Sequence, residues 1–97
     1  MNRLLLSARI VERGALRYTP AGIAAIDLEL KHESTLSEDR QARKVSLQLR
    51  ALALGEVTAG LASLPLGSDG TFAGFLAGAR NGRGVVFHVT AVEPAAA

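Results

Sequence analysis

The segment from Lys44 to Ala51 constrains the fold more than any other part of the chain, because its residues alternate strictly between two kinds. One kind is apolar, and the other is cationic or hydrogen-bonding, with no acid among them. The apolar set is Val45, Leu47, Leu49 and Ala51, and the polar set is Lys44, Ser46, Gln48 and Arg50. Successive side chains of a β-strand point to opposite faces of a sheet. The pattern therefore predicts a strand with one face in a core and the other carrying cations and polar groups.

Four other segments have the alternation or the turn signals of strands. The expected strands are 3–13, 23–31, 44–51 with an extension toward Leu54, 71–79 and 85–93. Pro65 and Gly67 close a helical segment expected within 56–64. Asn81-Gly82 is a strong hairpin signal between the last two strands. The range 32–43 is polar and has no period, so it is expected to be a loop.

Five short strands with one brief helical segment between the third and the fourth predict an all-β fold, a closed five-stranded OB-fold barrel. Gly74 and Gly78 lie within the fourth strand, where glycine marks the curvature that barrels need. An open antiparallel sheet packed on one helix is the rival architecture. The helical segment is too short to cover a sheet face, which favours closure. Residues 1–97 are expected to form one domain.

Composition excludes several classes of site. The chain has no cysteine, and His32 and His88 are its two histidines, so neither a disulfide nor a metal site is expected. No nucleophile–base pair is visible, which predicts a protein that is not an enzyme and needs no cofactor. No signal peptide and no run of about 20 apolar residues is present, so a cytoplasmic protein without membrane contact is expected.

The formal net charge is only +2, but the cations are clustered. Four of them lie within residues 40–50, and Arg80 and Arg83 flank the Asn81-Gly82 turn. Proteins that bind single strands combine a cationic groove with aromatic side chains. Tyr18 is the expected exposed aromatic, whereas Phe75 and Phe87 are expected in the core. The candidate nucleic-acid-binding residues are Arg13, Arg17, Tyr18, Lys31, Arg43, Lys44, Ser46, Gln48, Arg50, Arg80 and Arg83.

Several short segments, spread over nearly the whole chain, together resemble one family. They are Asn2-Arg3-Leu4, Pro20-Ala21-Gly22-Ile23, Leu30 with His32 and Ser34, and Gly74-Phe75 ahead of the Asn81-Gly82 turn. The spacing resembles primosomal replication protein N, the PriB family. The resemblance implies an OB-fold homodimer that binds single-stranded DNA and contacts the restart helicase PriA and other primosome proteins. It implies DNA contacts at the 43–46 region and at Arg80 and Arg83.

Three positions depart from that family's pattern. Gln41 and Ser46 stand where well-known members carry aromatics, and the acid Glu33 stands where a cation is usual. These differences favour weak DNA binding and leave open a protein–protein interaction module for which nucleic acid is incidental. An RNA-binding OB domain is a further alternative. Leu5, Val11, Ile23 and Ala25 lie on otherwise polar strand faces, which indicates either a dimer interface or an irregular barrel.

Overall fold

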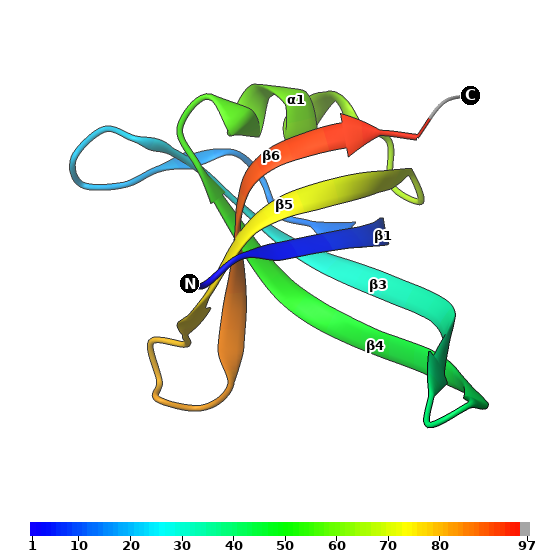
Figure 1. Cartoon of the computed structure of the whole chain (residues 1–97). Coiled ribbons are helices and arrows are strands. Elements are labelled where there is room, and N and C mark those ends of the chain that lie inside the picture. The colour runs from blue at the N-terminus through cyan, green and yellow to red at the C-terminus, as the bar shows by residue number, and fades with distance from the viewer. Residues whose placement is uncertain (96–97) are drawn as a thin grey trace.

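The computed structural model describes residues 1–95. Its elements in chain order are β1 (Leu4–Arg13), β2 (Arg17–Tyr18), β3 (Ala24–Glu38), β4 (Gln41–Leu54), α1 (Val57–Ser63), β5 (Asp69–Gly78) and β6 (Val85–Pro94). The five long strands form one curled sheet in the order β1-β5-β6-β4-β3, and pairing of β1 with β3 closes it (Figure 1). The predicted OB-fold barrel, with its short helix between the third and fourth barrel strands, is confirmed. The two-residue β2 lies at the edge of β3.

Two unusual strand pairings close the barrel. β1 pairs with β5 through Leu4–Arg9 and with β3 from Arg9 onward, and a register shift between Ile10 and Glu12 lets it bend from one neighbour to the other. β4 and β6 pair in parallel over three residues each, Ala51–Ala53 with Phe87–Val89. We call this short parallel pairing the β4–β6 seam.

The core fills the barrel with the side chains that alternation places on the inner face of each strand. α1 packs across one end and inserts Leu61, which is fully buried. The largest fully buried side chains are Ile10, Ile26, Leu30, Leu61, Phe72 and Phe87. Ala25 was expected to lie on an otherwise polar face, but it is 0% exposed, and β3 runs there between Arg17 of β2 and Leu54 of β4.

The prediction of a loop over 32–43 is wrong. β3 and β4 stay paired from the barrel to their last partners, Glu38 and Gln41, and the paired segment 32–47 projects from the barrel as a two-stranded ribbon (Figure 1). Asp39 and Arg40 form its turn, with positive φ angles of 50° and 65°. Both central residues of a type I′ hairpin turn need positive φ, and glycine usually supplies it. We call this segment the β3–β4 ribbon.

The ribbon changes the expected environment of the 44–51 strand. Its alternation is that of a strand, as predicted, but only Ala51 is fully buried among its four apolar residues. Leu47 is 37% exposed, and Leu36, which lies farther out on the ribbon, is 58% exposed. The reason is that the ribbon leaves the barrel near Leu49, so its inner face has no core to cover it.

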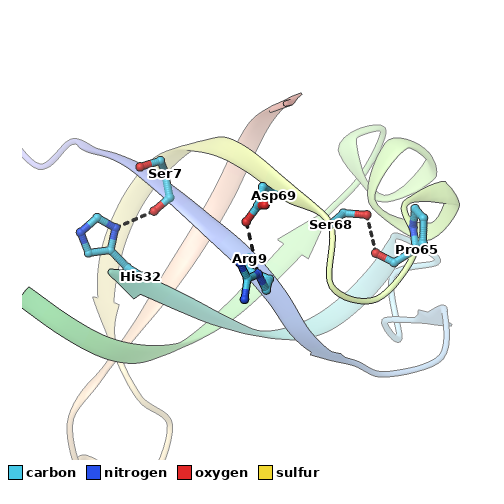
Figure 2. A network of polar contacts seen from close by, with 6 residues as sticks. All are labelled: Ser7, Arg9, His32, Pro65, Ser68 and Asp69. Carbon is cyan, nitrogen blue, oxygen red and sulfur yellow. Dashed lines mark hydrogen bonds and ion pairs between the residues drawn. The ribbon is translucent and has the colours of Figure 1, made fainter. Parts of the chain in front are cut away.

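His32 joins the base of the ribbon to β1. It is buried, with its Nδ1 2.6 Å from the Ser7 carbonyl oxygen and its Nε2 2.8 Å from the Ser34 hydroxyl. Figure 2 shows the contact with Ser7. That carbonyl lies on the side of β1 that β3 does not pair before Arg9. His32 therefore supplies a hydrogen bond where a neighbouring strand would otherwise do so.

Candidate nucleic-acid interface

A groove of about 500 Å³ crosses the outer face of the barrel beside the β4–β6 seam. Its lining residues come from the segment around β2, from β3, from β4, and from the end of β5 through the following turn into β6. Among the described residues that line it, the basic side chains are Arg17, Arg50 and Arg80, and the acid is Asp27. We call it the arginine groove. It gathers positive charge that is dispersed in the sequence.

Arg17 is held in place by the acid of the groove. Its Nε lies 3.0 Å from Oδ2 of Asp27, and its Nη2 lies 3.3 Å from Oδ1, so the contact is bidentate. These hydrogen bonds and the charge of Asp27 raise the pKa of the Arg17 guanidinium above its ordinary value. Because Arg17 neutralises the charge of Asp27, the charges of Arg50 and Arg80 remain available to a bound anion.

Arg50 and Arg80 reach the groove for different local reasons. Arg50 occupies an outward position of β4, next to the buried Ala51. Arg80 lies in the β5–β6 turn, where Gly82 has a φ of 75° and the Asn81 side-chain oxygen accepts the backbone N–H of Arg83 at 2.9 Å. The alternation of β4 and the chemistry of an Asn-Gly turn thus direct two distant cations to one place.

A neighbouring hollow carries no excess positive charge. It holds about 650 Å³ between β1 and β3, and its charged lining residues are the acids Glu12, Asp27 and Glu29 and the arginines Arg13 and Arg50. Asp27 is already paired with Arg17, so two acids and two arginines remain. The hollow therefore does not attract a polyanion, and the arginine groove is the better of the two for it.

Several other predicted residues extend the groove without lining it. Lys44, Ser46 and Gln48 are exposed on the same face of β4 as Arg50, and Lys44 lies roughly 20 Å from it along the strand at about 3.3 Å per residue. Tyr18 is 67% exposed beside Arg17. Arg83 is exposed in the β5–β6 turn.

Two predicted residues lie apart from this surface. Arg43 belongs to the opposite face of the ribbon from Lys44, and its Nε lies 2.8 Å from the carboxylate of Glu38. Lys31 is half-buried and lines a separate hollow of about 270 Å³ with Arg9, Glu33 and Asp69. In that hollow two cations face two acids, so it carries no excess charge to attract a polyanion.

Arg13, another predicted binding residue, makes a contact with the end of α1. Its guanidinium Nη1 donates to the carbonyl oxygen of Leu61 at 3.1 Å and to that of Leu64. The Leu61 carbonyl also accepts the backbone N–H of Leu64 at 3.3 Å, and the last carbonyl groups of a helix form the negative end of its dipole, where cations bind favourably. Arg13 therefore fixes the end of α1 to β1.

Replacing Arg13 with methionine is expected to lower the free energy of unfolding by about 1–3 kcal/mol, because the variant keeps the aliphatic stem but has no charged donor for the two carbonyl groups. Affinity for an oligonucleotide should stay unchanged. Urea denaturation and one binding titration measure the two effects. If the variant is as stable as the wild type but binds the oligonucleotide more weakly, the prediction is wrong and Arg13 contributes to binding.

Phe75 is the functional candidate that the sequence interpretation misplaced. It was expected in the core but is 39% exposed, and its ring stacks on His88 with centroids 4.9 Å apart and planes 11° apart. Phe87 is buried, as expected. The alternation of β5 contained the signal: Phe72 and Leu76 pack into the core, so Phe75 must face outward.

In residues 1–95, no three His, Asp or Glu side chains are grouped so that they would hold a metal ion. The one helix in the described part of the chain has seven residues, and no helix there is long and apolar enough to cross a membrane.

A closed five-stranded barrel with cations from two loops and a central strand in one outer groove has the ligand-binding arrangement of OB-folds. A family model described as another single-strand binding protein family matches residues 2–91. Fold, groove and match together define the class as a single-strand binding OB-fold protein.

Replication restart protein PriB from Bordetella pertussis is 50% identical over 80 residues, which are 82% of this chain and 75% of that protein. The chain therefore belongs to the PriB family of replication restart proteins, as the sequence resemblance predicted. The solved PriB from Ralstonia solanacearum is 35% identical, with a TM-score of 0.87 over 97% of both chains. The single-stranded DNA binding protein from Thermus aquaticus is 25% identical, with a TM-score of 0.77 over 99% of this chain and 50% of that one.

Proposed function

We propose that this protein binds single-stranded DNA in the arginine groove and acts as an accessory protein of replication restart. The observation that carries the proposal is the convergence of Arg17, Arg50 and Arg80, from three separate segments, on one groove whose acid is already paired. The names of the relatives supply the setting, since PriB proteins are replication restart proteins. Such a role is one of binding, with neither catalysis nor a cofactor, and it belongs in the cytoplasm with the DNA.

Phosphate groups would be the main contacts. Arg50 and Arg80 offer guanidinium groups to a bound anion, and Arg17 is preorganised by Asp27. Lys44, Ser46 and Gln48 continue the surface along β4 with one further cation and two hydrogen-bonding groups. Contacts to phosphate carry no sequence information, so binding should be insensitive to base sequence and strongly dependent on salt.

Replacing Arg80 and Arg83 with alanine is expected to weaken binding to a labelled oligonucleotide. The slope of log affinity against log salt should become shallower by about 0.7 units for each phosphate of a single strand that the variant no longer neutralises. Arg80 lines the groove and Arg83 does not, so Arg80→Ala alone should account for most of the change. Fluorescence anisotropy at several salt concentrations is the measurement, and an unaltered affinity in the double variant would reject the role of this turn.

We propose further that the protein is a homodimer that stabilises the restart helicase PriA on DNA together with other primosome proteins. Two features of β1 support a second copy: within residues 1–95 its segment before Arg9 has no strand partner on the β3 side, and Leu5 is 70% exposed. An unpaired strand edge with an exposed apolar residue is a surface that a second chain can cover. Light scattering measures the mass in solution, and a monomer at all concentrations would exclude the dimer.

A second candidate function is a protein-interaction module for which nucleic acid is incidental. The inner face of the β3–β4 ribbon favours it, since Leu36 and Leu47 are exposed there. A pull-down of PriA by the tagged protein, with and without nuclease, separates the two functions. Capture that survives nuclease supports the module, and capture that nuclease abolishes supports the DNA-dependent scaffold.

A further inference from the structure

Three apolar or aromatic side chains form a row across the outer face of the barrel, at right angles to the strands. Leu52 of β4 is the register partner of His88 of β6, and His88 is the register partner of Phe75 of β5. Leu52 and His88 line the arginine groove, and Phe75 continues the row beyond its edge. The row therefore begins inside the groove and ends on an exposed ring.

The rings in this row do not serve the core. Phe87 and Leu76, the neighbours of His88 and Phe75 in sequence, fill the interior on the other side of the sheet. Phe75 nevertheless keeps its ring parallel to that of His88 at 4.9 Å, and 39% of its surface remains exposed. Scattered exposed apolar residues are ordinary on proteins, but a stacked ring pair at the edge of a cationic groove is a specific arrangement.

The backbone beside Phe75 is held by an additional clamp. Asn2 precedes β1, and its side-chain amide donates to the Leu76 carbonyl oxygen at 2.6 Å and accepts the Leu76 N–H at 3.0 Å. The amide thereby reproduces a strand pairing beyond the last backbone pair, Leu4 with Gly74. Phe75 lies directly between these two tied residues of β5, so its backbone is held in place in the absence of a ligand.

We propose that the Phe75–His88 pair is a base-stacking platform for the nucleic acid bound in the arginine groove. The platform rests on the proposed function and adds to it the residues that contact bases. Arg50 lies two residues before Leu52 on the same face of β4, about 7 Å away at the rise of a strand. A phosphate at Arg50 thus leaves its base within reach of the row, where aromatic rings stack on any base.

The platform also compensates for the aromatics that the chain lacks elsewhere. Gln41 and Ser46 on the ribbon have no π-face, and Tyr18 lies at the other side of the groove, on β2. Phe75 and His88 come from β5 and β6, so the bases would be held by the barrel itself. A base that stacks on the rigid barrel causes a smaller loss of conformational entropy than one that stacks on a projecting ribbon.

The test compares the full-length protein with Phe75→Ala, Phe75→Leu and Phe75→Trp in anisotropy titrations with labelled oligothymidylate. Phe75→Ala and Phe75→Leu should weaken binding by about 5- to 140-fold, the conversion of about 1–3 kcal/mol per stacked base. Their salt slope should equal that of the wild type, because every cation that meets a phosphate is kept. Phe75→Trp should bind normally, and its fluorescence should be quenched by the oligonucleotide, since the chain has no tryptophan of its own.

An oligomer of abasic sites keeps the phosphates and removes the bases, so all variants should bind it like the wild type. Thermal unfolding checks that each variant is folded, and Phe75→Leu keeps an apolar side chain in case Phe75→Ala does not fold. Normal binding of oligothymidylate by both the alanine and leucine variants would overturn the platform alone. A wild type that binds no oligonucleotide would overturn the proposed function and the platform together.

Discussion

Replacing Gly74 with alanine is expected to prevent the barrel from closing, or to lower its free energy of unfolding by about 3 kcal/mol or more. A Cβ at this position would lie 1.8 Å from the carbonyl oxygen of His88 and 2.8 Å from its carbonyl carbon. Both are backbone atoms of the paired strand β6, so no side-chain rotation removes the overlap. The ring of Phe87, 3.0 Å away, blocks the same space from the core side.

Gly78 supplies the matched control in the same strand. A Cβ there meets no atom within 4 Å, and its φ is not positive. Gly78→Ala should therefore leave stability within about 1 kcal/mol of the wild type, while Gly74→Ala unfolds at much lower denaturant. Urea denaturation followed by circular dichroism compares the two. Equal midpoints would mean that β5 and β6 do not approach closely at Gly74.

Removing two cations from the groove should have the largest effect on binding. Arg50→Gln combined with Arg80→Gln is expected to reduce affinity for single-stranded DNA by about 100-fold or more at low salt, since each charged hydrogen bond is worth about 1.5–3 kcal/mol. The salt slope should become shallower by about 1.4 units for two phosphates. The same anisotropy titration, run at four or five salt concentrations, yields both numbers.

The control for this pair changes the net charge equally outside the groove. Arg9 is paired with Asp69, as Figure 2 shows. The distance from its Nε to the carboxylate oxygen is 3.3 Å, and Arg40 lies in the ribbon turn. Arg9→Gln with Arg40→Gln removes two charges and should alter affinity only a few-fold through the general field. If both double variants lose affinity alike, overall charge attracts the DNA and the groove has no special part.

The alternation of apolar and polar residues predicted most of the barrel. It identified the five strands because in each of them one face is buried, and it placed residues such as Ile26, Leu30 and Phe72 correctly in the interior. The β3–β4 ribbon was missed for the same physical reason. Neither face of its outer part is covered by a core, so no hydrophobic period marks residues 32–43. Its turn also lacks the glycine that usually identifies a two-residue hairpin, since Asp39 and Arg40 take that conformation themselves.

The sequence predicted which cations are exposed at the site, but not which other cations are held by contacts within the chain. Alternation in β4 and the Asn-Gly turn were enough to expose Arg50 and Arg80. Arg13 and Arg43 are equally basic in sequence, yet one binds carbonyl groups of α1 and the other pairs with Glu38. Those contacts join residues whose proximity depends on how the chain folds back, which composition does not encode. Phe75 was a different case, because the periodicity of β5 already placed it outside the core.

The shortness of the β4–β6 seam links ligand binding in the groove to the stability of the barrel. Only three residues of each strand pair there, whereas β3 and β4 are paired along nearly their whole length. The groove is lined from both sides of this joint, by Leu52 on β4 and His88 on β6. A ligand that contacts both strands would hold together the short β4–β6 pairing that closes the barrel. The free energy of ligand binding then adds to the free energy of opening the barrel, so the ligand-bound protein should be more stable to unfolding than the free protein.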